Sequence, residues 1–367
     1  MADSKMIFFH KPQINISCPS TSRMWLIAGC AFLCVLQSSL KDGGKSFVIA
    51  ITALLSALIL EFLLTRKVAA NNNGNSFAKI IDGSAAATAM IISIMLPNQM
   101  HPIYAALGTA FAIVVVKYSF GGLGSNWLNP ALGGWLFIRF SWPAAYEKAL
   151  ASSSVSITEM YTAYDISMID NSVTEFLNRN IFSIAGVQMP SGYINLLFND
   201  NASIITDRGL LTLLLGTIII TAIRINRNWI PLMFLAVYGF LIRLAGDAEV
   251  LWNGDMLYGI LSGGTIAAAF ILAAEPSSSA KLSSGILFSV ILGAVLSWFF
   301  RYKCMEYSGC FIAMALVNCI TPVIRHIEES IFFSRKKNNK NSVEFYQDKN
   351  NRFLQQNSPS SALKEKP

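Results

Sequence analysis

Long apolar runs recur along almost the whole sequence of 367 residues, and no other feature restricts the fold as much. A helix needs about 20 predominantly apolar residues to cross the hydrocarbon core of a bilayer, and the runs approach that length. Hydrophobic residues make up 53% of the chain and charged residues 13%, whereas soluble domains average about 25% charged residues. The sequence therefore predicts an all-α polytopic membrane protein.

The apolar runs divide into about ten candidate transmembrane helices, five in each half of the chain. They cover residues 24–40, 46–65, 78–96, 101–118 and 127–145, then 208–223, 229–246, 256–274, 282–300 and 309–325. Because five is odd, the second half enters the membrane from the opposite side, as in an inverted repeat. Asp82–Pro97 (DGSAAATAMIISIMLP) and Leu261–Pro276 (LSGGTIAAAFILAAEP) support this repeat, since both begin with small residues and end at proline. The alternative is a chance likeness between two closely packing helices.

The charges in the connections predict the orientation. Lys and Arg gather on the side of both termini, as the positive-inside rule requires of the cytoplasmic face. This side receives Arg66, Lys67, Lys117, Arg224, Arg227 and Lys281, and the opposite side receives the exceptions Lys41, Lys45, Arg301 and Lys303. The predicted segments are a cytoplasmic head (1–23), the first half (24–145), an external loop (146–207), the second half (208–325) and a basic, disordered cytoplasmic tail (326–367). Since the net charge of +7 sits in loops and tail, we expect no nucleic-acid partner.

Metal and hydrolytic sites lack a sequence signature. None of the six cysteines forms a CxxC pair, and the three histidines are scattered, so we expect neither a metal centre nor a catalytic triad. Cys30 and Cys34 lie one helical turn apart and are interpreted as small packing residues.

The segment Phe120–Phe137 (FGGLGSNWLNPALGGWLF) places glycine, asparagine and proline between two apolar runs. A dinucleotide fingerprint is excluded, because the third glycine and the βαβ unit are missing. Glycines alone would serve close helix packing. Asn126, Asn129 and Pro130, however, favour a broken helix start, which is tolerated only where it is buried in protein or lines a cavity. Such breaks mark ligand or ion sites in carriers built from repeats.

These residues carry a resemblance to a known family. FGGLGSNWLNPA resembles the FGGLGxNxFNPA signature of the D subunit of the Rnf complex, a homologue of the B subunit of the sodium-pumping NADH:quinone reductase. Further matching segments follow in order over most of the chain: Ser20-Thr21 with Met24, Asp82-Gly83-Ser84, Trp229-Ile230-Pro231, Ala274-Glu275-Pro276 and Tyr307-Ser308-Gly309.

The resemblance implies two inverted five-helix halves similar to urea and ammonium channels. It implies a subunit, not catalytic alone, of an ion-translocating ferredoxin:NAD⁺ oxidoreductase in the bacterial inner membrane. Its partners would be the other subunits of the complex and membrane lipid. A stand-alone channel or secondary transporter for a small solute is the alternative function.

The resemblance also implies flavin: FMN linked to a threonine of an (S/T)GAT motif in the external loop, and riboflavin. Here Asp170–Leu177 (DNSVTEFL) stands nearest to that motif, with Thr174 at the attachment position and the bulkier Val173 before it. Alternatively, Thr174 is an ordinary residue near a capped helix start. The segment 152–158 (SSSVSIT) is a second candidate.

Ionisable residues near the span ends are few: Glu61, Asp82, Arg139, Arg243 and Glu275. A charge in hydrocarbon is costly unless it faces a partner or a cavity. Asp82, with Gly83 and Ser84, is predicted to hold a cation or the polar edge of a flavin, with a helix-start charge as the alternative. For Glu275 we expect a helix-end role, and for Arg139 an acidic partner near the outer surface.

Overall fold

The described part of the chain is built from helices. The structure, a computed structural model, describes residues 20–72, 82–119, 126, 128–151, 179–180, 196–197, 202–223, 227–245, 252, 254–275 and 278–330. Within these ranges no strand forms, and the extended contact is an isolated antiparallel bridge between Pro97 and Ile204.

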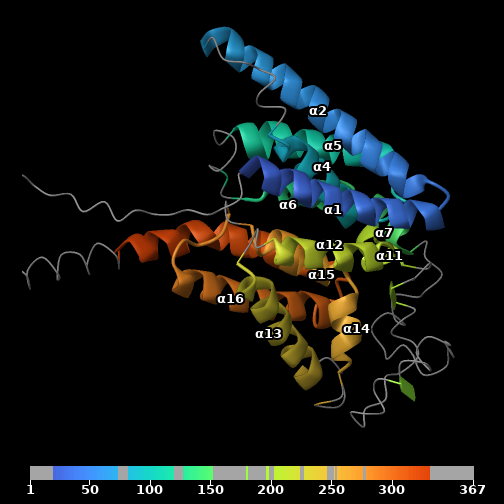
Figure 1. Cartoon of the computed structure of the whole chain (residues 1–367), viewed down its shortest axis with the longest axis vertical. Coiled ribbons are helices and arrows are strands. Elements are labelled where there is room, and N and C mark those ends of the chain that lie inside the picture. The colour runs from blue at the N-terminus through green and yellow to red at the C-terminus, as the bar shows by residue number, and fades with distance from the viewer. Residues whose placement is uncertain are drawn as a thin grey trace, which may run out of the picture.

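The first half begins with a helical hairpin, drawn in blue in Figure 1. Asp42 closes its turn, because its carboxylate accepts hydrogen bonds from the backbone nitrogens of Gly44 (3.2 Å) and Ser46 (3.1 Å). The elements of this half are α1 (Ser20–Lys41), α2 (Lys45–Asn72), α4 (Ser84–Met95), α5 (Pro102–Phe111), the π-helix η1 (Ala112–Tyr118), α6 (Pro130–Ser141) and α7 (Pro143–Ala151).

Helix α4 is the centre of the first half. Every one of its residues is buried, and it packs against both α1 and α2. Its sequence SAAATAMIISIM explains this, since small side chains in the first turns let neighbouring helices approach closely.

The second half lies beside the first in Figure 1, below it in that view. Its third helix is broken between α14 and α15, where Gly263 (φ +68°) and Gly264 (φ +70°) adopt left-handed backbone. The elements of this half are α11 (Ile205–Arg208), α12 (Leu210–Ala222), α13 (Trp229–Ala245), α14 (Met256–Leu261), α15 (Thr265–Ala267), the π-helix η4 (Ala268–Leu272), α16 (Ser283–Tyr302) and a last helix, Gly309–Ser330.

Each predicted apolar range contains a described helix, but three differ in extent. In the range 78–96 the described helix begins at Ser84. In the range 127–145 it begins at Pro130 and is interrupted at Trp142 before α7. The range 256–274 is interrupted by the two glycines. Hydropathy does not reveal these breaks, because the residues that cause them lie inside apolar runs.

The two halves meet along α1 and α12, where glycines face the cysteines of α1. A Cβ on Gly216 would lie 2.9 Å from the Cβ of Cys30, and one on Gly209 would lie 2.3 Å from the carbonyl oxygen of Cys34. Both cysteines are buried and free, so they act as the small packing residues that the sequence predicts.

The helical bundle has two ends, and the polar side chains described below lie near them. The start of α1 and the red end of the last helix lie at one end, which we call the terminal end, and α7 and α11 lie at the other, which we call the distal end (Figure 1). Helix α4 runs from the terminal to the distal end.

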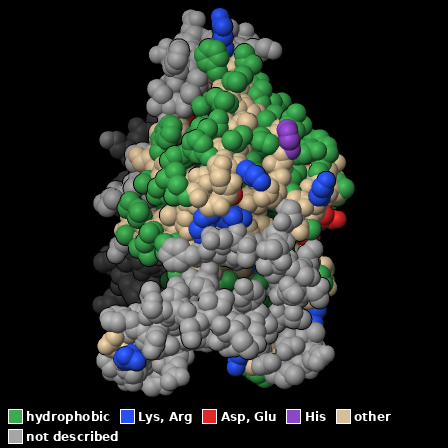
Figure 2. Space-filling view, turned by 90° about the vertical axis from the view of Figure 1, so that its right-hand side faces the viewer, with side chains coloured by type: hydrophobic (Ala, Val, Ile, Leu, Met, Phe, Trp, Pro, Cys, Tyr) green, Lys and Arg blue, Asp and Glu red, His purple; other side chains and the backbone are tan. Residues whose placement is uncertain are grey.

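The outer surface of the bundle is apolar. Large hydrophobic side chains are exposed along α2, among them Leu55 (52%) and Ile59 (57%), and Figure 2 shows hydrophobic side chains over the flanks of the described upper part. Among the described residues, four helices are long and apolar enough to cross a membrane: Thr21–Lys41, Lys45–Arg66, Ser283–Tyr302 and Gly309–Ser330. The structure is therefore that of an all-α membrane protein.

Candidate functional site

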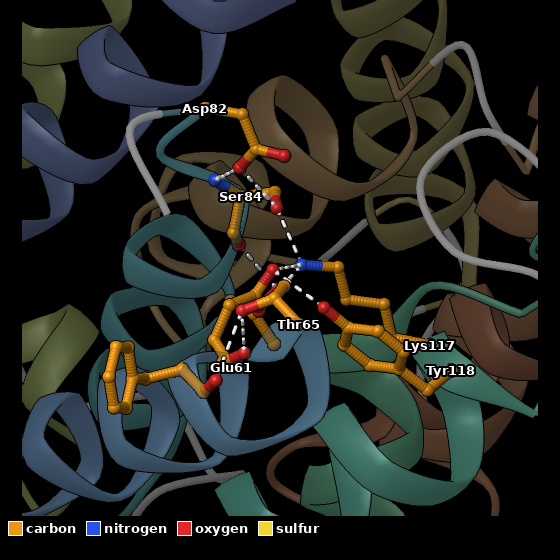
Figure 3. Close-up of polar contacts among 8 residues, drawn as sticks. Glu61, Thr65, Asp82, Ser84, Lys117 and Tyr118 are labelled. Atoms are coloured by element: carbon orange, nitrogen blue, oxygen red, sulfur yellow. Dashed lines mark hydrogen bonds and ion pairs between the residues drawn. The ribbon is translucent and has the colours of Figure 1, made fainter. Parts of the chain in front are cut away.

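A buried ion pair lies at the terminal end of the first half (Figure 3). Lys117 ends the π-helix η1, and its Nζ lies 2.8 Å from each carboxylate oxygen of Glu61 in α2. The side chains of Lys117 and Glu61 are only 4% and 2% exposed. Nζ also donates to Ser84 Oγ (2.6 Å), and the Tyr118 hydroxyl donates to Glu61 (3.3 Å). Such additional hydrogen bonds are what a buried ion pair requires to offset its desolvation.

Asp82, Gly83 and Ser84 form the start of α4, as the sequence predicts for the entry to the third helix. Gly83 has φ +74°, and a Cβ there would lie 2.8 Å from the indole nitrogen of Trp25, so the position requires glycine. One carboxylate oxygen of Asp82 accepts from Ser84 N (2.8 Å) and from Ser84 Oγ (2.7 Å). Asp82 therefore caps the start of α4, and Ser84 links it to Lys117. A contact of Asp82, Gly83 and Ser84 with a cation or a flavin stays a prediction. We call Glu61, Asp82, Ser84, Lys117 and Tyr118 the lysine cluster.

A second buried cation lies at the distal end, in the second half. Arg301, near the end of α16, is 1% exposed. Its Nη1 donates to the carbonyl oxygens of Ser262 (2.8 Å) and Gly259 (3.0 Å), and its Nη2 donates to Ser262 Oγ (2.6 Å). The guanidinium also lies over the rings of three tyrosines, that of Tyr307 at 5.5 Å.

Asp207 completes this second group of side chains. Its carboxylate accepts from the backbone nitrogens of Gly263 (2.8 Å) and Gly264 (3.0 Å), and from the Tyr307 hydroxyl (2.5 Å). The carboxylate thus satisfies the first amides ahead of α15, which is the role that Asp82 has ahead of α4. We call Asp207, Ser262, Thr265, Arg301 and Tyr307 the arginine cluster.

The two clusters occupy equivalent places in their halves. Lys117-Tyr118 and Arg301-Tyr302 each end the fourth helix, and each cation reaches the start of the third helix, where a left-handed glycine precedes Ser84 or Thr265. Asp207 lies three residues after Ile204, which bridges the residue beyond the end of α4. The clusters therefore lie near opposite ends of α4, whose 12 residues span about 18 Å.

Both cations correct the sequence-based charge count. Lys117 was assigned to an inner loop and Arg301 to an outer loop, but the side chains are buried, with 3% and 1% of each residue exposed. Both side chains are bound inside the protein, so they do not count as loop charges that indicate the orientation of the chain in the membrane. The signal that identifies them is the repeated cation–tyrosine pair at the end of the fourth apolar run of each half.

Asn129 and Pro130 start α6 inside the protein, as the predicted broken helix requires. The side chain of Asn129 caps the helix by accepting from Ala131 N (2.8 Å), and its Nδ2 donates to a carboxylate oxygen of Glu275. Asn129 and Asn126 are each 4% exposed. The contact joins the fifth helix of the first half to the end of the third helix of the second half, so Glu275 has more than a helix-end role.

Arg139 forms ion pairs with Glu306 and Glu147, which are the acidic partners that the sequence predicted without identifying them. Its Nη2 lies 3.0 Å from Glu306 and 3.4 Å from Glu147, and the guanidinium lies 4.9 Å from the centre of the Tyr146 ring. The Arg139 side chain is 14% exposed, so this pair is more accessible than the two clusters.

The predicted flavin positions are not among the described residues. Thr174 and the segment 152–158 both lie outside the ranges given above, so covalent attachment of FMN stays a prediction.

Comparison with known proteins agrees with a membrane protein. The sequence model of the NQR2, RnfD, RnfE family matches residues 8–333. The D subunit of the proton-translocating ferredoxin:NAD(+) oxidoreductase complex of Clostridium ljungdahlii is 26% identical over 337 residues, which cover 91% of this chain and 98% of that protein. The D subunit of the ion-translocating oxidoreductase complex of Alcanivorax borkumensis is 27% identical over 304 residues, which cover 81% and 88%. The D subunit of the Na(+)-translocating ferredoxin:NAD(+) oxidoreductase complex of Acetobacterium woodii is 24% identical over 287 residues, which cover 78% and 80%.

The chain belongs to the NQR2, RnfD, RnfE family.

Proposed function

We propose that the chain is a membrane subunit of an ion-translocating complex that couples ferredoxin and NAD⁺ redox chemistry to ion transport. The observation that carries this proposal is the match of the family over residues 8–333, together with relatives that are named as subunits of such complexes. The names of those relatives give the ion as a proton in one and as Na⁺ in the other. The ion of this chain is therefore left to experiment.

The proposed architecture consists of ten membrane-crossing helices in two inverted five-helix halves, similar to urea and ammonium channels. Three observations support it: a described helix in every predicted range, the left-handed glycine ahead of both α4 and α15, and the equivalent lysine and arginine clusters. We place the chain in the bacterial inner membrane with both termini in the cytoplasm. The terminal end, with the lysine cluster, then faces inward.

The chain itself supplies two helix starts that are anchored by buried cations. Lys117 and Arg301 hold the first residues of α4 and α15 by hydrogen bonds, so a charge change near either cluster acts on the position of a helix. In a low-dielectric interior such electrostatic coupling is stronger than in water. Redox change elsewhere in the complex would thus bias one helix pair, which is a local switch with a global effect.

We propose two flavins as electron carriers, FMN on Thr174 and riboflavin elsewhere in the subunit. A binding residue is proposed only for FMN. A flavin supplies the electron-transfer chemistry, and the protein supplies its orientation and electrostatic surroundings. Ultraviolet fluorescence of the purified chain in a denaturing gel, followed by intact mass, tests the covalent link. A fluorescent band with the mass of one FMN, lost in Thr174→Ala, is expected; a dark band of bare mass would remove covalent FMN from the proposal.

The test of the subunit assignment is purification through a tag on this chain in mild detergent. We expect the other subunits of the complex to copurify and to be identified by mass spectrometry. The alternative is a stand-alone channel or transporter for a small solute. A chain that purifies alone and conducts a solute in proteoliposomes would replace the proposal with that alternative.

Asp82 provides a residue-level test. In proteoliposomes that contain the whole complex, Asp82→Ala is expected to lower ion transport while the same subunits still copurify. The Asp82→Asn variant retains an oxygen that accepts from Ser84 and is the matched control for the loss of charge. Unchanged transport in both variants would limit Asp82 to capping α4.

A further inference from the structure

A small, partly open cavity lies in the second half, between the end of η4, the start of α16 and the last helix. Its volume is about 20 Å³, and about 10–15 Å³ on the same measure is enough for one water molecule. The cavity thus has room for a single water-sized occupant. The polar residues that line it are Glu275, Ser278, Ser279, Ser289, Asn318 and Thr321.

Asn318 faces this cavity with an unpaired amide. The residue is 7% exposed, and its Nδ2 has no hydrogen-bond partner among the described residues. Buried polar groups are paired in the great majority of cases, and each exception calls for a missing partner. Because the oxygen and nitrogen of an asparagine amide are assigned from their surroundings, turning the Asn318 amide over would put its oxygen at the position where Nδ2 has no partner.

The other polar groups present oxygen lone pairs. Ser289 Oγ donates its hydrogen to Gly285 O (2.8 Å), and Thr321 Oγ1 donates to Val317 O (2.9 Å). Each hydroxyl therefore donates its hydrogen bond within its own helix, and only its oxygen lone pairs remain available to accept or coordinate. Ser278 Oγ likewise donates to Glu275 (3.3 Å). A carboxylate, three hydroxyl oxygens and an amide around one small space form a set of hard oxygen ligands.

The position in the fold also favours a cation. The cavity lies at the C-terminal end of a broken third helix, whose last turns form the π-helix η4. Carbonyl groups at a helix C-terminus carry partial negative charge, and single π-helical turns occur frequently at functional sites. In carriers built from inverted repeats, the ends of such broken helices coordinate the transported ion.

The connection before α16 is clamped to the last helix next to the cavity. Arg325 donates to the carbonyl oxygen of Ser279 from Nε (3.1 Å) and Nη2 (2.7 Å). Glu328 accepts from the backbone nitrogens of Lys281 (3.0 Å) and Leu282 (3.1 Å). Partial burial and the nearby Arg325 lower the pKa of Lys281, while Glu328 opposes this shift. The Ser278–Ser279 side of the cavity is therefore held in place and does not depend on an occupant for its position.

We propose that this cavity binds one small monovalent cation, with Na⁺ as the probe, between the Glu275 carboxylate, the Asn318 amide oxygen and the hydroxyl oxygens of Ser289 and Thr321. A single positive charge matches the single carboxylate, and a cation of this size fits where one water fits. The proposal rests on the proposed function, because it assigns a binding position in this chain to the transported ion. Asn129, which also bonds Glu275, links the site to the segment FGGLGSNWLNPA.

Thermal unfolding of the full chain, purified in detergent, tests the site. Sodium chloride is titrated against choline chloride at constant ionic strength, and a saturable rise in unfolding temperature specific to Na⁺ is expected, since a ligand that binds only the folded state stabilises it. Glu275→Gln and Asn318→Leu are each expected to raise the half-saturating Na⁺ concentration on the order of tenfold or more. Asn318→Leu fills the cavity with an apolar group and removes the unpaired amide, so it is expected to fold.

Asn98 supplies the matched control. It is also a buried asparagine, 2% exposed, whose Nδ2 has no partner in the described ranges, but it does not line the cavity. Asn98→Leu is expected to leave the Na⁺ effect unchanged. Equal behaviour in sodium and choline would mean that the cavity holds water only. A Na⁺ effect that survives in both Glu275→Gln and Asn318→Leu would place the ion elsewhere; either result overturns the site. Copurification of the other subunits is measured in the same variants. It tests the proposed function, whereas the Na⁺ titration tests the site, so the failure of one is distinguished from the failure of the other.

Discussion

The lysine cluster and the arginine cluster solve the same structural problem with different chemistry. Each brings a cation from the end of a fourth helix to the start of α4 or of α15, where a left-handed glycine precedes the helix. Lys117 is neutralised directly by the carboxylate of Glu61 at 2.8 Å. Arg301 is bonded to carbonyl and hydroxyl oxygens, and the nearby carboxylate of Asp207 bonds the backbone and Tyr307 instead.

The difference follows from the two side chains. The lysine ammonium is a compact point charge with three donors, whereas the arginine guanidinium is a planar fork with five donors. A fork reaches several fixed backbone carbonyls at once, so the arginine cluster depends on geometry. A point charge depends on its counter-charge, so the lysine cluster depends on Glu61.

The largest expected effect is therefore the loss of Glu61. Glu61→Ala leaves Lys117 buried without its carboxylate, and removing one partner of a buried pair costs about 3–5 kcal/mol. The measurement is the free energy of unfolding in mixed micelles. The double variant Glu61→Leu with Lys117→Met removes both charges and is expected to regain most of the loss. A single variant that unfolds like the wild type would show that the pair is not the support of α4.

Arg301→Met is expected to be less costly, because the carboxylate of Asp207 keeps its hydrogen bonds to Gly263, Gly264 and Tyr307. It leaves the carbonyl and hydroxyl of Ser262 without their donor, and an unsatisfied buried group costs about 1–3 kcal/mol. The same unfolding measurement checks the value. A loss larger than that of Glu61→Ala would reverse the proposed difference between the clusters.

The two exchanges of cation sharpen the comparison. Arg301→Lys loses the second nitrogen that reaches Ser262 Oγ, so we expect it to restore little of what Arg301→Met loses. Lys117→Arg retains the charge for Glu61 and is expected to be tolerated better than Lys117→Met. Equal rescue by both exchanges would mean that only charge matters at both clusters.

The glycines ahead of the third helices should respond alike. Gly83→Ala and Gly264→Ala place a Cβ at φ +74° and +70°, a left-handed conformation that costs about 1–2 kcal/mol for L-residues. Contacts add to this, since the new Cβ would lie 2.8 Å from Trp25 and 2.3 Å from Phe311. Gly29→Ala, whose Cβ would meet nothing within 4 Å, is the control for an unstrained helix position. A loss in only one of the two glycine variants would break the equivalence.

The smallest effect is expected at Arg139, which belongs to neither cluster. Its ion pair with Glu306 is partly exposed, at 14% and 19%, and accessible pairs contribute about 0–1 kcal/mol. Glu306→Gln should therefore change unfolding little, and less at high salt because exposed pairs are screened. A loss comparable to that of Glu61→Ala would show that burial does not rank these pairs.

The sequence predicted the helices better than the contacts between them. Apolar runs located a helix in every range, and small residues identified α4 as a buried helix. The break at Ser262–Gly264 was not predicted, because backbone conformation at glycine does not register in hydropathy. Asp82, Gly83 and Ser84 lie at the start of α4, which was the alternative to their predicted contact with a cation or a flavin. Asn129 and Pro130 lie at the start of α6, where a broken helix was predicted.

The partners of the charged residues escaped prediction for a different reason. Glu61 and Lys117 are 56 residues apart and Asn129 and Glu275 are 146 apart, and nothing local in the sequence pairs them. Counting Lys117 and Arg301 as loop charges assumed that a charge at a span end points to water. The structure shows that both side chains point into the interior of the protein.

The most direct test of the central claim asks whether the two clusters face opposite sides of the membrane. Cys304 and Ser119 are both exposed, and they follow Arg301 and Lys117 closely in the chain. A variant that keeps Cys304 alone, and one that carries only Ser119→Cys, are labelled in intact cells with a membrane-impermeant maleimide. We expect Cys304 to be labelled from outside, and the cysteine at position 119 to be labelled only after the cells are permeabilised. Labelling of both positions from the same side would contradict the inverted arrangement of the two halves.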